Sequence, residues 1–220
     1  MEGGRVIVVD LETVAVAGVK TEPVTAPANY KDEAKIAAYV KEKQAEQITR
    51  AALYPWTARI VALGWCEEGE DVERVTVCDS EATEATALRE FWARAVDNRG
   101  AVTPLVTFAG RTFDLPVMLA RSRMLGVKAP ILDLRKYGNS HPDLLKILTF
   151  DYEQPSRSLK WFAELFQLDV SDAFSGKEIA QLYEDKNFDA IRSHCASDVR
   201  LTRQLGEKLG LLHAPVRAVA

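Results

Sequence analysis

The chain has 220 residues, of which 47% are hydrophobic and 27% charged, and its formal net charge is −4 at pH 7. This mildly acidic balance excludes a general nucleic-acid binder coated with positive charge, so any site for a polyanion must be local. The three cysteines fit no zinc spacing, and no apolar stretch is long enough for a signal peptide or a membrane span. These features predict a cytoplasmic protein with reduced thiols and no membrane partner.

The first predicted element is a strand over residues 6–13, which is almost entirely apolar apart from Asp10 and Glu12. Such a strand is buried on both faces of a sheet. Because successive side chains alternate, the two carboxylates project from the same face. Carboxylates this close repel each other and are costly to desolvate, and a divalent cation between them would remove that cost. The pair therefore indicates either half of a metal site or a solvated turn at the strand end.

Residues 20–53 differ from their surroundings. A proline-punctuated loop precedes a stretch rich in Ala, Lys and Glu, with a thin apolar stripe through Ile36, Val40 and Ile48. Strong helix formers with so narrow a stripe predict a helical insertion on the surface. Tyr30 and the lysines of this segment could guide a nucleic-acid strand, whereas its acidic residues are equally typical of an ordinary solvated helix. Both interpretations stay open.

The remaining predicted elements alternate between strands and helices. We expect a hairpin of strands over residues 59–65 and 72–77, a helix over 82–97, a buried strand over 104–108, and helices over 115–125, 141–148, 158–166, 177–183 and 189–209. This order predicts an α/β fold of three layers, with a mixed central sheet flanked by helices. A single domain is expected over residues 1–210, followed by a loose tail over residues 211–220.

Two later segments carry polar groups that could join the first pair. Asp114 follows the buried strand at the predicted start of a helix, where a carboxylate also serves as an ordinary helix cap. His194 and Asp198 are four residues apart on the last predicted helix, and they therefore lie one above the other on one face. Taken alone, such a pair is more often an exposed surface pair.

Taken together, the three segments resemble, in order and context, the DEDD superfamily of 3′ to 5′ exonucleases, whose fold is ribonuclease H-like. The closest resemblance is to predicted exonucleases related to the proofreading domain of family B DNA polymerases. It is carried by the carboxylate strand, by GRTFDLP at 110–116, HPDL at 141–144, SLK at 158–160, and the run over 175–199. The resemblance implies catalytic roles for Asp10, Glu12, Asp114, His194 and Asp198. It also implies substrate-binding roles for Leu11, Thr13, Phe108, Gly110, Arg111 and Phe113.

The resemblance implies a metal-dependent exonuclease that acts on single-stranded 3′ ends and releases nucleoside 5′-monophosphates, with DNA expected rather than RNA. Two Mg²⁺ or Mn²⁺ ions would be held by the four carboxylates of Asp10, Glu12, Asp114 and Asp198, because these cations prefer hard oxygen ligands. His194 would accept the proton of the attacking water or orient that water. Replication or repair proteins are the expected kind of protein partner.

The chain departs from the usual pattern of this family at two positions. His194 occupies the spacing at which the last motif usually has Tyr, whereas the histidine branch usually has one more residue between His and Asp. Ala109 stands where the second motif usually has Asn. That asparagine is closer to substrate contacts than to metal ligation, so its loss bears on affinity or substrate range rather than on the chemistry.

Three alternatives stay open at this point. An exoribonuclease or a structure-selective nuclease can use the same fold, because fold does not determine substrate. A catalytically inactive nucleic-acid-binding module would be expected to have lost at least one carboxylate, and all four are present. A haloacid dehalogenase-type phosphatase also begins with a buried strand and an Asp, but it requires Asp where this chain has Glu12.

Overall fold

The computed structural model describes residues 5–135, 138, 140–172 and 174–214. Its sheet has the strand order β3-β2-β1-β4. The strands are β1 (Ile7–Ala15), β2 (Ala58–Glu67), β3 (Arg74–Val77) and β4 (Leu105–Val106). β1 pairs antiparallel with β2 and parallel with β4, and β2 pairs antiparallel with β3, so the sheet is mixed.

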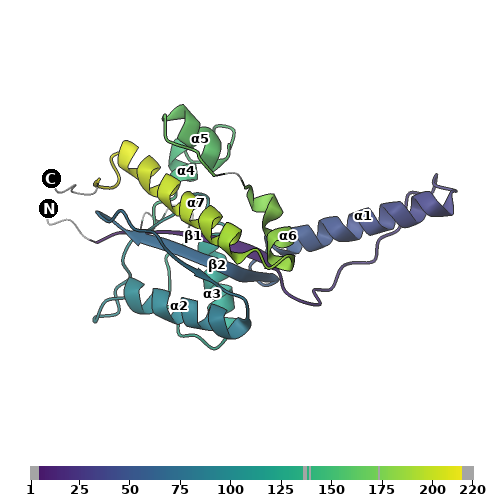
Figure 1. Cartoon of the computed structure of the whole chain (residues 1–220), viewed down its shortest axis with the longest axis horizontal. Helices are drawn as coiled ribbons and strands as arrows, with labels where there is room; N and C mark the ends of the chain where they lie inside the picture. Colours follow the sequence, from purple (N-terminus) through teal and green to yellow (C-terminus); the bar gives the residue numbers. More distant parts are fainter. Residues whose placement is uncertain (1–4, 136–137, 139, 173, 215–220) are drawn as a thin grey trace.

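Helices cover both faces of this sheet (Figure 1). One face packs against α2 (Glu81–Ala95) and α3 (Asp114–Met124), and the other against α4 (Leu144–Leu148), α5 (Leu159–Leu165) and α7 (Phe188–Lys208). A short 3₁₀ turn, η1 (Gly176–Glu178), and α6 (Ile179–Glu184) precede α7. The three-layer α/β architecture predicted from the sequence is confirmed. Within the described residues, no helix combines the length and the apolar character that crossing a bilayer requires.

The alternation of side chains along β1 sends its carboxylates to the α7 face. Ile7, Val9 and Leu11 are buried in the core shared with α2 and α3, while Val8 belongs to the core shared with α7. Asp10 and Glu12 follow Val8 at steps of two and therefore face the same side. A bulge after Glu12 interrupts the ladder with β2, so this alternation ends just beyond the second carboxylate.

The helix α7 lies directly on β2 because Gly64 has no side chain. A Cβ atom at Gly64 would lie 2.6 Å from Sγ of Cys195 and 2.9 Å from a methyl carbon of Val199, closer than real Cβ atoms come. Gly64 is also the residue that pairs with Asp10 in the ladder between β1 and β2. The close approach of helix and sheet is therefore made at the level of the first carboxylate.

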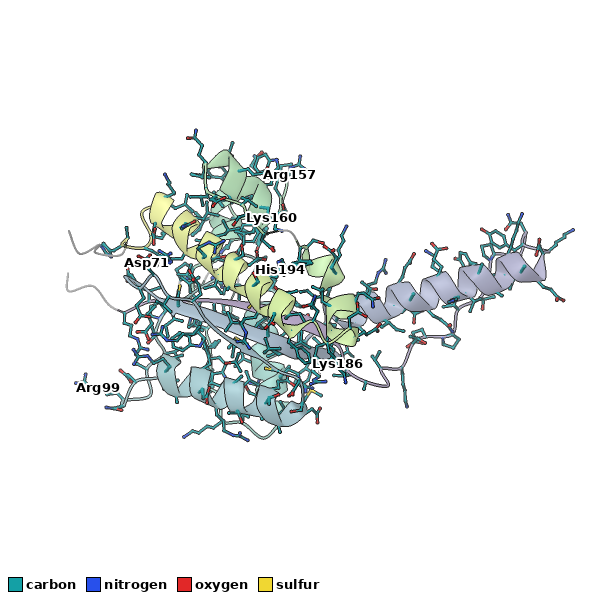
Figure 2. The ribbon with its side chains drawn as sticks, viewed as in Figure 1. Asp71, Arg99, Arg157, Lys160, Lys186 and His194 are labelled. Atoms are coloured by element: carbon teal, nitrogen blue, oxygen red, sulfur yellow. The ribbon has the colours of Figure 1, made fainter. Side chains whose placement is uncertain are left out.

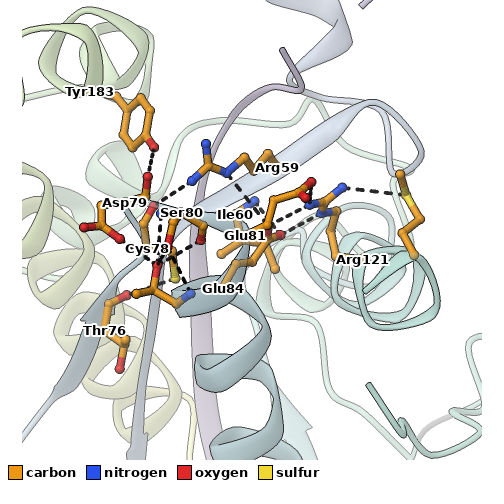
Figure 3. A network of polar contacts seen from close by, with 12 residues as sticks. Arg59, Ile60, Thr76, Cys78, Asp79, Ser80, Glu81, Glu84, Arg121 and Tyr183 are labelled. Carbon is orange, nitrogen blue, oxygen red and sulfur yellow. Dashed lines mark hydrogen bonds and ion pairs between the residues drawn. The ribbon is translucent and has the colours of Figure 1, made fainter. Parts of the chain in front are cut away.

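On the opposite face, a buried ion pair joins α2 to α3 (Figure 3). The Arg121 guanidinium donates to both carboxylate oxygens of Glu84 at 2.7 Å, and both side chains are at most 1% exposed. Glu84 also accepts the amide of Ile60 in β2 at 3.0 Å. One carboxylate thus connects two helices and a strand.

The insertion forms α1 (Glu33–Ala51), which buries none of its residues and projects from the body of the molecule (Figure 1). Asp32 caps its first turn by accepting from the amides of Ala34 and Lys35. At its base, Thr13 donates its hydroxyl to the carbonyl of Ala52 at 2.7 Å. The insertion is therefore fastened to β1 one residue beyond Glu12.

The chain end packs against the body as far as it is described. Leu212 is buried and lies against Gly206 in α7. A Cβ atom added to Gly206 would lie 2.7 Å from the Cδ1 atom of Leu212. His213 donates its amide to Glu68 at 2.8 Å. The loose tail expected from residue 211 therefore does not begin there, and residues 215–220 lie outside the described part of the chain.

Candidate active site

Asp114 lies beside β1, although 103 positions separate it from its partner Leu11. Its Oδ1 atom accepts the Leu11 amide at 3.1 Å, between the two carboxylate-bearing residues of the strand. Asp114 is the first residue of α3, the cap position belongs to Phe113, and no side chain caps this helix. The structure therefore does not support the interpretation of Asp114 as an ordinary helix cap.

From the other direction, α7 brings His194 and Asp198 to the same place. Nε2 of His194 lies 3.4 Å from Oε1 of Glu12 and 3.9 Å from Oδ2 of Asp198. His194 is 1% exposed, so it is no surface histidine. Figure 2 marks its place on α7. Ligand atoms of Glu12, His194 and Asp198 lie within 4.8 Å of one another.

The converging carboxylates oppose one another's ionisation. Burial raises the pKa of Asp10 well above its usual value, and repulsion from Asp114, Asp198 and Glu12 raises it further. Burial and repulsion from Asp198 and Asp114 do the same for the pKa of Glu12. Burial raises the pKa of Asp114 to about 7. A group of negative charges this crowded is stabilised by a cation.

The donor set fits a hard divalent ion. Burial, as its largest cause, raises the pKa of Asp198 too, and the Oδ1 atom of this residue is buried with no hydrogen-bond partner among the described residues. Buried polar atoms are almost always paired, so an oxygen of this kind is available as a ligand. Carboxylate oxygens from three chain segments are the ligand type that Mg²⁺ and Mn²⁺ prefer.

Cys195 is a neighbour of the site that the sequence did not indicate. Its Sγ atom and ligand oxygens of Asp10 and Glu12 lie within 4.8 Å of one another. Burial, followed by repulsion from the carboxylates, raises the pKa of this thiol well above its usual value. The Sγ atom also packs against Gly64, and a thiol is a softer ligand than Mg²⁺ or Mn²⁺ prefers.

Asp172 is a further site residue that the sequence reasoning missed. Its Oδ2 atom lies 2.5 Å from Nδ1 of His194 and 3.0 Å from Nζ of Lys160. Burial opposes its charge, but hydrogen bonds from His194, the Phe174 amide and Lys160 hold the pKa of this carboxyl below its usual value. Asp172 lies in a loop without periodicity, so no spacing signal could have found it. Lys160 belongs to a motif that carried the family resemblance, but it had been given no role.

The HPDL segment, residues 141–144, holds the backbone of the second motif in place by hydrogen bonds. Asp143 accepts the amides of Ala109 and Arg111 at 2.9 and 3.2 Å, and it also caps α4. Nδ1 of His141 accepts the Leu105 amide at 3.2 Å. Ala109 adopts a φ of 63°, a left-handed conformation that Asn tolerates better than Ala. The substitution of Ala for the usual Asn therefore costs backbone strain at this turn.

Three of the residues expected to bind substrate have other contacts. The Leu11 side chain is buried in the core with α2 and α3, and the Thr13 hydroxyl is bonded to Ala52. The Arg111 guanidinium is bonded to the carbonyls of Gly138 and Arg135. At these three positions the side chains have contacts within the protein, and their roles in substrate binding stay a prediction.

The other three residues border the site. Gly110 is packed so tightly that an added Cβ would lie 2.7 Å from Oδ2 of Asp114. Phe108 is half-buried, with its ring centre 6.1 Å from that of Phe162. Phe113 is also half-buried and packs against the core with α2 and α3. Their expected contacts with substrate stay a prediction.

Solved structures place this fold among known proteins. A family B DNA polymerase from the hyperthermophilic archaeon Pyrobaculum calidifontis is similar with a TM-score of 0.63 and 18% identity over 94% of this chain and 24% of the polymerase chain. A product-bound exonuclease I and an ExoI/SSB-Ct complex give TM-scores of 0.45 and 0.46, each at 10% identity over 95% of this chain, and 48% and 46% of theirs. This chain therefore spans about a quarter of the polymerase and about half of exonuclease I. None of the curated proteins matches.

The fold is ribonuclease H-like, and the class of enzyme is that of the 3′ to 5′ exonucleases. A family model described as predicted 3′-5′ exonuclease related to the exonuclease domain of PolB matches residues 53–205. That match covers well over half of the chain, and the chain belongs to this family, as the sequence resemblance predicted. Membership implies dependence on divalent metal ions.

Proposed function

We propose that this exonuclease hydrolyses phosphodiester bonds at single-stranded 3′ ends of DNA and releases nucleoside 5′-monophosphates. The observation that carries the proposal is the convergence of carboxylates from β1, α3 and α7 on one side of the sheet, beside a buried histidine. Carboxylates so placed disfavour one another's charge, which is costly unless the site serves to bind cations.

Each residue has a proposed role in that reaction. Asp10, Glu12, Asp114 and Asp198 would hold two divalent ions. Such ions, when bound, neutralise the scissile phosphate and lower the pKa of a water molecule. His194 is positioned to accept a proton through Nε2, which faces Glu12 and Asp198.

Support for DNA comes from the relatives. The family is described by its relation to the exonuclease domain of PolB, and the polymerase of similar fold is a DNA polymerase. An exoribonuclease on the same scaffold is the second candidate, because recognition of the 2′-hydroxyl is a local contact that the fold does not specify.

The test is digestion of matched 5′-labelled DNA and RNA oligonucleotides with Mg²⁺, with Mn²⁺ and with EDTA. We expect a ladder of progressively shortened 5′-labelled products from DNA, slower shortening of RNA, and no reaction in EDTA. A single cut at an internal position would instead identify an endonuclease. Faster digestion of RNA would assign the enzyme to the exoribonucleases.

Removing any one of Asp10, Asp114 or Asp198 should abolish most of the activity. Each Asp→Asn variant loses one charge of the ion-binding group, and we expect kcat to fall by about three orders of magnitude or more. Melting temperatures in EDTA should stay equal or rise, because repulsion is relieved. Glu90→Gln, an exposed carboxylate on α2, is the matched control and should keep wild-type activity. A variant of the three with wild-type turnover would exclude that residue from the site.

A further inference from the structure

The two ring nitrogens of His194 have different partners. Nδ1 lies 2.5 Å from Oδ2 of Asp172, on the side away from the carboxylate group. Nε2 faces Glu12 at 3.4 Å and Asp198 at 3.9 Å. Because the side chain is 2% exposed, these contacts and not water determine how the ring is oriented.

The Asp172 carboxylate is also held in place by two donors other than the histidine. Nζ of Lys160 lies 3.0 Å from the same Oδ2 atom, and the Phe174 amide donates to the other oxygen at 3.1 Å. Lys160, which lies in α5, also donates to the carbonyl of Phe174. The Asp172 side chain is 4% exposed. A carboxylate fixed by two donors presents a defined acceptor to the imidazole.

We propose that Asp172 is a positioning residue for catalysis, which fixes the ring and the tautomer of His194 so that Nε2 faces the reacting groups as a proton acceptor. An ionised carboxylate only accepts hydrogen bonds, so Nδ1 must be the donor. In a neutral imidazole the proton on Nδ1 leaves the lone pair on Nε2. The contacts of the Asp172 carboxylate among the described residues are with His194, Lys160 and the Phe174 amide, so in this proposal it acts through the histidine. This inference rests on the proposed function of His194.

The pairing also accounts for the unusual last motif. A tyrosine at this spacing needs no partner to present its single hydroxyl, whereas a histidine has two nitrogens that can exchange roles. Asp172, 22 residues earlier in the chain, is bonded to Nδ1 of His194 and so determines which nitrogen carries the proton. The histidine and its aspartate therefore function as one unit in this chain.

The kinetic test is a double-mutant cycle on the full chain with a single-stranded DNA oligonucleotide. We expect His194→Ala to lower kcat by two to four orders of magnitude, and Asp172→Asn to lower it by about two, with KM changed less than about threefold. In the His194→Ala background, Asp172→Asn should change kcat by less than about twofold. Asp169→Asn, an exposed aspartate of the same loop, is the matched control and should behave as wild type.

A second measurement is independent of activity. Nitrogen chemical shifts of the imidazoles in Mg²⁺ at alkaline pH report the tautomer of each histidine, and His194→Gln assigns the relevant signals. We expect the proton of His194 on Nδ1 in the wild type and a mixture of tautomers in Asp172→Asn. A proton on Nε2 in the wild type would overturn the inference even if Asp172→Asn folds poorly.

The outcomes of the cycle separate this inference from the proposed function. If His194→Ala keeps wild-type turnover, the proposed role of His194 fails, and the role of Asp172 fails with it. Loss of activity in His194→Ala but not in Asp172→Asn would overturn the positioning role alone. An equal loss from Asp172→Asn in both backgrounds would overturn it too, because the aspartate would then act through some other contact.

Discussion

At the scale of single residues, the carboxylates of the candidate site repel one another in the metal-free protein. Asp10 and Glu12 are placed by the alternation of β1, and Asp114 is held against the same strand by the Leu11 amide. Among the described residues, no Lys or Arg forms an ion pair with these carboxylates, and His194 is the one basic side chain close to them, with Nε2 at 3.4 Å from Glu12. The protein itself therefore supplies little positive charge to offset their repulsion.

This repulsion predicts how stability depends on pH. In the folded protein the pKa of Asp114 is raised to about 7 by burial, and burial and mutual repulsion also raise the pKa values of Asp10 and Glu12 well above their usual range. The folded state then binds protons more tightly than the unfolded state, whose carboxylates have pKa values of about 4. Their stabilising contribution is complete below about pH 4 and is lost as the pH rises through the folded values.

We therefore expect the melting temperature in EDTA to rise as the pH is lowered from 8 to 6, measured by circular dichroism. Asp114→Asn should weaken this dependence, because it removes a group that titrates in this interval. Added Mg²⁺ should stabilise the wild type most at pH 8, by linkage to binding. A melting temperature in EDTA that falls as the pH is lowered from 8 to 6 would contradict the raised pKa values of these carboxyls.

At the scale of elements, the layer opposite the active site depends on one buried ion pair. Arg121→Met leaves the Glu84 carboxylate buried with the Ile60 amide as a hydrogen-bond donor and only the longer ion pair with Arg59, whose Nε lies 3.9 Å away. Breaking such a pair from one side typically costs about 3–5 kcal/mol. We expect urea denaturation of Arg121→Met to show a loss of this size.

The double variant Glu84→Gln/Arg121→Met should lose less than the single one. Glutamine is neutral and still offers an acceptor to the Ile60 amide, so the buried unpaired charge disappears. Lys43→Met breaks an exposed ion pair with Glu46 on α1 and should leave the denaturation midpoint unchanged. A double variant no more stable than the single one would mean that packing, not charge, dominates at Glu84.

The insertion is the element whose role the structure leaves for experiment. Because α1 buries none of its residues, replacing residues 21–50 with a short flexible linker should leave the melting temperature of the body nearly unchanged. If α1 guides the substrate, binding of long single strands should weaken while hydrolysis of a small chromogenic phosphodiester persists. Parallel loss of both activities would show that the segment has a structural role instead.

At the scale of the whole molecule, the chain end closes the core between α7 and β1. A chain ending at Gly210 loses Leu212, which is 5% exposed, and the bond from His213 to Glu68. Removing a buried leucine costs about 2–5 kcal/mol, with the lower value expected where a terminus can relax. Denaturant unfolding of this variant should show the loss, and a chain ending at Ala214 should not. Equal stability of both would place the domain boundary at residue 210 after all.

The sequence could predict the features that depend on the periodicity of a single strand or helix, but not the contacts made by irregular loops. The position of Asp10 and Glu12 on one face depends only on the period of a strand, and that of His194 and Asp198 only on the period of a helix. The contact of Asp172 with His194 depends on a loop that no period describes. The family resemblance implied a substrate-binding role for Arg111, but it gave no sign that carbonyls 24 and 27 residues away accept from its guanidinium. Its contact with substrate stays a prediction.

Because Gly64 has no side chain, we expect the activity of the protein to be sensitive to substitution at this position. An alanine there would push Cys195 and Val199 outward, and α7 would carry His194 and Asp198 away from Glu12 and Asp10. One methyl group would thus separate the two halves of the proposed reaction centre without altering any of the residues proposed to form it. In a library of all single substitutions, we expect Gly64→Ala to lose activity as the carboxylate variants do. The Gly64→Ala protein can nevertheless still accumulate in the cell.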